Sequence, residues 1–345
     1  MNDIGIGIVG VGRLGYVHAY NLSRQVAGAR LVAVCEIDEK VGRKTADEFG
    51  SKYYKDLNHM LEDKDVDAVC VVTATPHHVE PVTAVAQANK PLFCEKPLAS
   101  TLEDTKRLAA VIKEAGIPCQ MGFHRRFDPD FAEGEKMIRE GIIGKPVFVS
   151  GYSRDPFPPP PTSCDPSKGG GLFFDMMLHD FDMARFLMKD EVSSVYADES
   201  NLVVDGKGIH RFSDNATAHL RFNNGGLANF HGSWHAWYGY DIRTEVHGSE
   251  GGILMGGINS HELTLMLKEK GITKPKTFQT QGKIPHFMYR FKDAYVQEMI
   301  AFVDCLLDNR KPLVNEDDAL AAFRIAIAAD RSASQRQPVS LESIR

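Results

Sequence analysis

The sequence lacks several features that would define a specialised class of protein. None of its six cysteines forms a CxxC pair, so neither a zinc site nor a disulfide framework is indicated. No apolar run approaches the roughly 20 residues that cross a bilayer, and no basic segment followed by a signal-type apolar stretch opens the chain. Acidic residues exceed basic ones, giving a net charge of −6, which argues against a nucleic-acid partner. We therefore expect a cytoplasmic protein without a bound metal, disulfide, membrane or nucleic acid.

Alternation of strand-like and helix-like segments dominates the first part of the chain. With 345 residues, the chain is long enough for two domains, each with its own core. The nearly continuous apolar run at 66–72 is typical of a parallel strand covered on both faces. This βαβ alternation predicts an α/β domain over residues 1–122, a doubly wound parallel sheet of the Rossmann type.

A glycine motif, Gly10-Val11-Gly12-Arg13-Leu14-Gly15, directly follows the first apolar run. Gly10 allows a tight turn, Gly12 lets the backbone approach a pyrophosphate, and Gly15 lets the next helix pack closely on the strand. That helix, which starts near Arg13 and Leu14, presents unpaired N–H groups and its positive dipole end to phosphates. A turn that binds nothing is the alternative, but the whole strand–glycine–helix unit favours a dinucleotide site.

Glu36 ends the second apolar run, at the distance from the glycine motif where dinucleotide-binding proteins carry an acid. A carboxylate there accepts hydrogen bonds from the hydroxyls of the adenosine ribose and repels a 2′-phosphate. We therefore predict NAD as the cofactor in preference to NADP. Asp38, two residues further on, is expected to assist Glu36.

Two more predicted strands end at short segments that contain polar residues, 73–76 and 95–97. Because ligands of such sheets lie at the carboxyl ends of the strands, these residues should border the same crevice as the glycine motif. The cofactor-binding residues expected there are Thr73, Thr75, Pro76, Glu95 and Lys96.

Lys96 has a feature that most solvated surface lysines lack. Pro97 restricts the backbone of Lys96 to an extended conformation, so the direction in which its side chain leaves the backbone is restricted too. A cation in that position would bind a substrate hydroxyl and stabilise a developing alkoxide.

The pattern changes after residue 122. Strands are expected at 147–152, 195–200, 216–222, 227–235 and 244–247, and helices at about 131–140 and 175–188. These segments predict a second, α+β domain over 123–345 with a large, mainly antiparallel open sheet, whose uncovered face favours a homo-oligomer. Asn315 and the three acids after it predict a capped helix at about 316–333, packing back near the first domain.

Asp175 and His179 lie four residues apart beside an apolar stripe of helical spacing, so they should share one helix face. A carboxylate can orient an imidazole and tune its pKa, and neutral histidine can accept a hydroxyl proton near physiological pH. The glycines at 169–171 would let the backbone pack tightly against a ligand. A capping aspartate with a structural histidine is the simpler alternative, and a metal would need more ligands than this segment offers.

Together, the glycine motif, Glu95-Lys96-Pro97 and the segment from the three glycines to His179 resemble the glucose–fructose oxidoreductase/inositol dehydrogenase family over essentially the whole chain. Within it, the segments 122–128 and 238–242 look most like the inositol 2-dehydrogenase branch. The resemblance implies NAD-dependent oxidation of a ring hydroxyl of a cyclic polyol or sugar, such as myo- or scyllo-inositol, in a homotetramer or dimer. Family members often carry Asp where this chain has Glu36, which reaches one methylene further.

Residue roles also follow from the resemblance. His179 would be the general base, Asp175 would orient it, and Lys96 would position the hydroxyl and the nicotinamide ribose. The hydrogen on carbon would pass as hydride to NAD. The resemblance places four further residues in the substrate pocket, namely His124, Arg125, Asp155 and Tyr238.

Two other functions stay open from the sequence. One is a pyranose or anhydrosugar dehydrogenase or reductase that uses the same three residues. The other is a non-catalytic NAD(H)-binding regulator, which would have no need for Lys96, Asp175 and His179 together. The proline run at 156–161 should be stiff and extended, as a rigid wall or a subunit contact.

Overall fold

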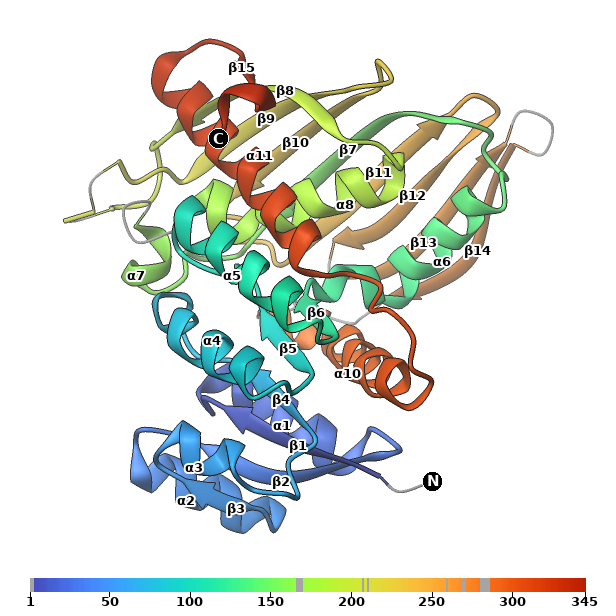
Figure 1. The fold of residues 1–345 in the computed structure, drawn as a ribbon. Helices are drawn as coiled ribbons and strands as arrows, with labels where there is room; N and C mark the ends of the chain where they lie inside the picture. The colour runs from blue at the N-terminus through green and yellow to red at the C-terminus, as the bar shows by residue number, and fades with distance from the viewer. Residues whose placement is uncertain are drawn as a thin grey trace. The chain divides into compact units, whose positions relative to one another are not determined.

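The computed structural model describes residues 3–165, 170–206, 208–209, 211–258, 260–267, 271–279 and 286–345. The chain divides into two compact units, each made of two segments (Figure 1). The first unit comprises Met1–His124 and Asp293–Leu320, and the second comprises Arg125–Lys292 and Ala321–Arg345.

The first unit is built on a six-stranded parallel sheet in the order β3-β2-β1-β4-β5-β6, which confirms the predicted Rossmann-type topology. Successive strands are added on one side of β1 up to β3 and on its other side from β4 onwards, so the order switches between β1 and β4. Because the strands are parallel, their carboxyl ends all lie at one edge of the sheet. The strands are β1 (Ile4–Val9), β2 (Ala29–Cys35), β3 (Lys52–Tyr54), β4 (Ala68–Val71), β5 (Leu92–Glu95) and β6 (Cys119–Gly122). The connecting helices are α1 (Arg13–Arg24), α2 (Glu39–Phe49), α3 (Leu57–Leu61), α4 (Val79–Gln87) and α5 (Leu102–Ala115).

Local side chains set the ends of these helices. The Thr101 side chain accepts a hydrogen bond from the Asp104 N–H and caps the start of α5. Gly50 and Gly116 end α2 and α5 in the left-handed conformation, with φ values of 68° and 65°, which glycine adopts without steric cost. The helix boundaries therefore follow from single residues of the sequence.

The first unit also contains α10 (Lys292–Leu307), a helix that the sequence analysis did not predict. Its Met299, Phe302 and Val303 belong to the same buried core as Ile6 and Ile8 of β1. The division drawn at residue 122 placed α10 in the second domain, whereas the structure returns it to the first unit. Apolar residues cover several faces of α10, so no single stripe marked it as a helix.

The second unit contains a nine-stranded sheet in the order β14-β13-β12-β11-β7-β10-β9-β8-β15. Its described pairs are antiparallel except for β7 with β10, so the predicted mainly antiparallel open sheet is confirmed with one parallel pair. The strands are β7 (Pro146–Arg154), β8 (Val192–Ser200), β9 (Asn215–Phe222), β10 (Leu227–Ser233), β11 (Asp241–Gly248), β12 (Gly251–Ile258), β13 (Ser260–Leu267), β14 (Gly271–Gln279) and β15 (Val339–Ser340).

Helices pack on one face of this nine-stranded sheet. α6 (Pro129–Arg139) and α8 (Leu178–Met188) lie over it in Figure 1. Gly134 permits the close approach of α6, because a Cβ at that position would lie 2.2 Å from the Met255 sulfur of β12. The unit also contains two single-turn helices, α7 (Pro161–Cys164) and α9 (Phe287–Arg290).

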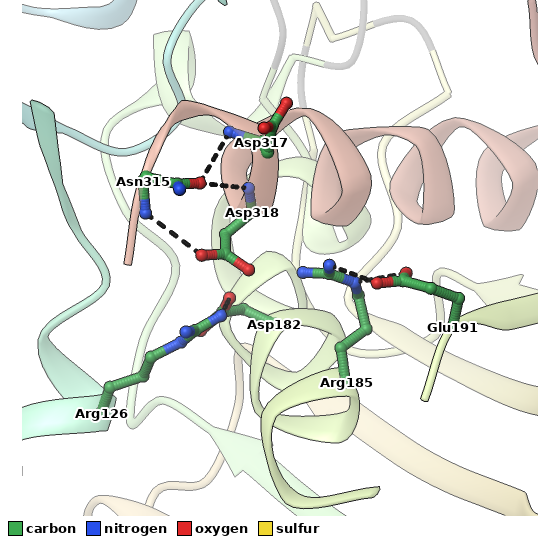
Figure 2. A network of polar contacts seen from close by, with 7 residues as sticks. All are labelled: Arg126, Asp182, Arg185, Glu191, Asn315, Asp317 and Asp318. Carbon is green, nitrogen blue, oxygen red and sulfur yellow. Dashed lines mark hydrogen bonds and ion pairs between the residues drawn. The ribbon is translucent and has the colours of Figure 1, made fainter. Parts of the chain in front are cut away.

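The predicted C-terminal helix forms as α11 (Glu316–Gln335), with a reciprocal cap shown in Figure 2. The Asn315 side-chain oxygen accepts hydrogen bonds from the Asp317 and Asp318 N–H groups at 2.9 and 3.2 Å. Asp318 accepts one in return from the Asn315 N–H at 3.1 Å. The first turn of α11 belongs to the first unit and its remainder to the second, where Phe323 packs on Phe174 with ring centroids 5.4 Å apart.

All six cysteines are buried free thiols. Burial raises the pKa of both Cys35 and Cys164 to about 12, so these thiols carry a proton at neutral pH. None of the described helices has both the length and the apolar character that a membrane span requires.

Candidate active site

The glycine motif forms a tight turn between β1 and α1. Gly10 has a φ of +84°, and a Cβ at Gly15 would lie 2.0 Å from the Gly10 carbonyl oxygen. Gly12 precedes α1 without a side-chain cap, and a Cβ there would meet nothing within 4 Å. Gly10 and Gly15 therefore serve the turn itself, while Gly12 leaves open space before the exposed Arg13 and half-buried Leu14, as a bound pyrophosphate requires.

Glu36 at the end of β2 bends back to this turn. Its carboxylate accepts hydrogen bonds from the Val11 N–H at 2.9 Å and from the Asp38 N–H at 3.1 Å. The Asp38 side chain caps α2 by accepting a hydrogen bond from the Val41 N–H at 3.1 Å. The Glu36 carboxylate thus lies beside the glycine turn, and Asp38 stabilises the start of α2. Open space at Gly12 with an anion beside it fits a dinucleotide that lacks a 2′-phosphate.

A buried histidine that sequence reasoning missed joins the loops after β4 and β5. The two ring nitrogens of His78 each lie 2.9 Å from a backbone oxygen, one of Thr73 and the other of Pro97. Thr75 and Pro76 lie in a short 3₁₀ turn within the loop after β4, with Thr75 half-buried and Pro76 exposed. His78 therefore lies between the loop of Thr73 and the loop of Lys96, and its ring can donate a hydrogen bond to either backbone oxygen.

Glu95 ends β5 and Lys96 directly follows it, at the same edge of the sheet as the glycine motif. The Glu95 carboxylate pairs with the His18 ring, with 2.8 Å between Oε1 and Nε2, and accepts a hydrogen bond from the Lys96 N–H at 3.2 Å. Glu298 of α10 lies beside this pair. Among the described residues, His18, Glu95 and Glu298 form the one group of three or more His, Cys, Asp or Glu side chains whose ligand-type atoms lie within 4.8 Å of one another.

Asp175 and His179 do not lie on one α-helix as predicted. Asp175 lies in a π-helical turn (Leu172–Met176), and His179 follows in the first turn of α8. Gly171, with a φ of +89°, starts the π-helical turn. The two side chains thus come from adjoining elements, because glycine geometry and the π turn interrupt the regular helical spacing. His179 is 6% exposed and Asp175 is half-buried.

The glycines before this turn pack against protein. A Cβ at Gly170 would lie 2.4 Å from the Ser163 carbonyl oxygen, and the Gly171 N–H donates to the same oxygen at 2.8 Å. Gly170 and Gly171 therefore pack on α7, which begins at the last proline of the run, while their packing against a ligand stays a prediction. Gly169 lies outside the described residues.

Asp155 and Tyr238 lie around the ends of β7 and β10, close to the segment of His179. The Asp155 N–H donates to the Ser233 carbonyl at the end of β10. In the same region a Cβ at Gly232 would lie 2.9 Å from Met177, just before α8. The second unit thus collects Asp155, Tyr238 and the π-helical turn at one end of two parallel strands.

A polar network that the sequence analysis missed surrounds Tyr238. The Tyr238 hydroxyl donates to the Asp241 carboxylate at 3.1 Å, and Arg154 pairs with the same carboxylate at 3.1 Å. Arg154 also donates to the His231 ring at 2.9 Å. Burial and the Arg154 charge lower the pKa of His231 to about 4, so this ring is neutral at physiological pH. In the sequence, only the alternation of polar residues along β7 and β11 indicated this network.

Arg125, predicted to line the substrate pocket, is 4% exposed and forms an ion pair with Asp180 at 2.6 Å. Ser153 bonds to both members of this pair. Burial raises the pKa of Asp180, and the Arg125 charge acts against that rise. His124 belongs to the first unit and packs on Tyr295, with ring centroids 4.7 Å apart.

The next residue, Arg126, makes two hydrogen bonds to Asp182 in the same unit (Figure 2). The segment 125–126 therefore anchors α8 through two buried ion pairs. Sequence reasoning found Arg125 but not its partners, because the acids of α8 gave no indication of which face they occupy.

The fold and the glycine site define an oxidoreductase with an NAD-binding Rossmann domain. Residues 4–123 match the oxidoreductase family with an NAD-binding Rossmann fold, and residues 131–254 match the GFO/IDH/MocA C-terminal domain. The chain belongs to the GFO/IDH/MocA oxidoreductase family.

Relatives resemble the chain over nearly its whole length. It is 38% identical to myo-inositol 2-dehydrogenase of Thermotoga maritima, over 98% of this chain and 99% of that protein. It is 36% identical to scyllo-inositol 2-dehydrogenase (NAD⁺) of Bacillus subtilis, over 97% and 95%. Among solved structures, scyllo-inositol dehydrogenase of Lactobacillus casei with bound NAD(H) and scyllo-inositol matches with a TM-score of 0.85 and 28% identity, over 99% and 100%.

Proposed function

We propose that this protein oxidises one secondary hydroxyl of a cyclic polyol, myo- or scyllo-inositol, to the ketone, with NAD as the hydride acceptor. The observation that carries the proposal is the likeness to inositol dehydrogenases over nearly the full length of both chains. The carboxylate of Glu36 beside the glycine turn supports NAD as the cofactor.

In the proposed mechanism, one group accepts the proton of the substrate hydroxyl and another accepts the hydride. His179 takes the proton of the reacting hydroxyl, Asp175 orients its ring, and the Lys96 ammonium stabilises the oxygen as negative charge develops on it. NAD, when bound, accepts the hydride that leaves the ring carbon. Tyr238 and Asp155 offer hydrogen-bond groups to further hydroxyls of the ring, and His124 and Arg125 are proposed to border them.

A substrate panel tests this function. Purified protein is incubated with NAD or NADP and with myo-inositol, scyllo-inositol, D-chiro-inositol, glucose or xylose, while the absorbance of the reduced cofactor is followed. We expect NAD-linked rates on at least one inositol well above those on the sugars, because buried polar groups reject substrates that leave them unpaired. Turnover of sugars alone would assign the chain to the sugar dehydrogenases of the family, and NADH binding without any turnover would favour a regulator.

Substitution of Glu36 tests the account of cofactor choice. Glu36→Ala removes the charge that repels a 2′-phosphate, so the ratio of kcat/KM for NADP to that for NAD should rise by about tenfold or more. Glu36→Gln separates charge from shape and should raise the ratio as well. Glu62→Ala, at an exposed position at the end of α3, is the control. An unchanged ratio in both Glu36 variants would refute this role.

We also infer that the chain forms a homo-oligomer, a tetramer or a dimer, through the open face of the nine-stranded sheet. Exposed apolar side chains on that sheet include Tyr152, Tyr196 and Leu227. Light scattering should give a mass of two or four times 38.2 kDa. A monomer at micromolar concentration would contradict the inference.

A further inference from the structure

A buried cluster of three titratable side chains lies behind the start of the Lys96 loop. His18 comes from α1, Glu95 from the end of β5 and Glu298 from α10, all within the first unit. His18 and Glu298 have no exposed surface, and Glu95 is 5% exposed. Nε2 of His18 lies 2.8 Å from the nearer oxygen of Glu95 and 3.8 Å from that of Glu298.

Glu298 is the unexplained member of this cluster. Within the described part of the chain, neither of its carboxyl oxygens has a hydrogen-bond partner. A buried carboxylate without donors is strongly disfavoured, whereas the protonated acid is tolerated and can itself donate. Burial, together with the charge of Glu95, raises the pKa of Glu298 well above its usual range. Burial beside a second carboxyl group thus favours the neutral form of Glu298.

Among the residues that the structure describes, the approach of His18 is the one ion pair of the Glu298 carboxyl group. The titratable groups near it are His18 of α1, Cys70 of β4 and Glu95 of β5, with Tyr295 one turn earlier in α10. Burial raises the pKa of the Cys70 thiol, which therefore stays neutral. Phe93 and Tyr295 pack edge-on against the His18 ring, with centroids 5.3 and 5.7 Å away, and keep the cluster apolar on those sides.

The cluster leads directly to Lys96. One oxygen of Glu95 faces His18, and the other accepts the hydrogen bond from the Lys96 N–H. Gly122 at the end of β6 leaves the room that this carboxylate occupies, because a Cβ there would lie 2.7 Å from its Oε2. The Glu95 carboxylate is therefore confined on three sides, and its displacement would move the Lys96 backbone.

We propose that Glu298 is a positioning residue whose neutral carboxyl group fills the space beside the His18–Glu95 pair in the working enzyme and thereby holds the backbone of Lys96 in place. The link to Lys96 rests on the proposed function. The protonation of Glu298 rests on the cluster alone, so the two parts are tested by separate measurements.

The first measurement detects the proton on the Glu298 carboxyl group and does not require turnover. Infrared spectra of the full-length protein at neutral pH should show a carboxylic acid C=O band that disappears in Glu298→Gln. A raised pKa in the folded state also means that folded Glu298 keeps a proton that the unfolded chain has lost. As the pH rises above about 4.5, the unfolding equilibrium constant of the wild type relative to Glu298→Gln should therefore increase by up to tenfold per pH unit.

Glu114→Gln, an exposed position in α5, is the matched control and should change neither the infrared band nor the pH dependence. Absence of the band from the wild type, or its persistence in Glu298→Gln, would overturn the proposal. A metal ion that copurifies with the wild type and is lost from Glu298→Gln would also overturn it, because the three side chains would then be ligands.

The second measurement tests the connection to Lys96. Glu298→Gln keeps the shape and the donor of the neutral acid, so kcat should stay within about threefold of the wild type. Glu298→Ala removes both, and kcat should fall by about tenfold or more, because small displacements of a positioned group are costly. If Glu298→Ala does not fold, the Glu298→Gln result decides: a loss of kcat in this variant as large as that of Lys96→Ala would refute the positioning role. A wild type inactive on every polyol would count against the proposed function, but would leave the infrared result valid.

Discussion

Replacing His179 with alanine should lower kcat by about 10²–10⁴, the usual contribution of a general base. The reacting hydroxyl must lose its proton as the hydride leaves the carbon, and without an acceptor only water can take that proton. His179 is 6% exposed, so little bulk solvent can reach its position to replace it. Binding of NADH, measured by fluorescence, should stay within about twofold, because the proposed cofactor residues belong to the other unit.

His59→Ala is the matched control for this variant. His59 is exposed in α3, and its loss should leave kcat unchanged. Asp175→Asn separates orientation from charge, and should lower kcat less than His179→Ala while shifting the acid limb of the pH–rate profile to lower pH. Turnover retained in His179→Ala would remove His179 as the base and return it to the structural role that the sequence left open.

Replacing Lys96 with alanine should lower kcat by about 10²–10³, the usual cost of losing one charge-stabilising donor at a reacting oxygen. The backbone of Lys96 is tied to Glu95, and the loop that follows is tied to His78 through the Pro97 carbonyl. This double attachment fixes the start of the side chain, so an added amine in solution should restore only a small part of the rate. KM for the polyol should rise together with the fall in kcat.

Lys96→Arg is an informative second variant. It keeps the charge but replaces a compact ammonium with a planar guanidinium, so it should recover only part of the lost rate. Lys106→Ala, exposed in α5, serves as the control. A change in melting temperature with normal kinetic constants in Lys96→Ala would make Lys96 a structural residue.

Local signals explain why so much of the first unit followed from the sequence. Gly10 is required by its positive φ, and Gly15 by the carbonyl oxygen that lies close to it. Each requirement is met by glycine, so both positions can be recognised in the sequence. Caps such as Thr101 and Asn315 act within three residues of their helix. Parallel strands buried on both faces read as apolar runs, so β4 and β5 were found in order.

Features that depend on distant partners were missed. α10 joins the first core from beyond residue 290, and no nearby residue indicates that contact. The strand β12 carries three glycines besides its first residue, which weaken its strand signal, and β15 is only two residues long. The parallel pairing of β7 with β10 similarly depends on the rest of the sheet.

The same distinction applies to the candidate site. Glu36 and Lys96 stand out because each directly follows a strand. His18, His78 and Glu298 are buried polar residues within helical segments or at their ends, where only the fold reveals their partners. Asp175 and His179 were found as a pair, but the π-helical turn between them could not be read from a spacing of four, because that spacing also suits a regular α-helix.

Transfer of deuterium from substrate to cofactor tests the central claim most directly. The protein is incubated with NAD and myo- or scyllo-inositol deuterated at the ring carbons, and the reduced cofactor is analysed by mass spectrometry and NMR. The account predicts one deuterium at C4 of the nicotinamide, and none when unlabelled inositol reacts in deuterated water. Reduced cofactor without deuterium, or no reduction with either inositol, would contradict the claim that this chain oxidises a ring hydroxyl by direct hydride transfer.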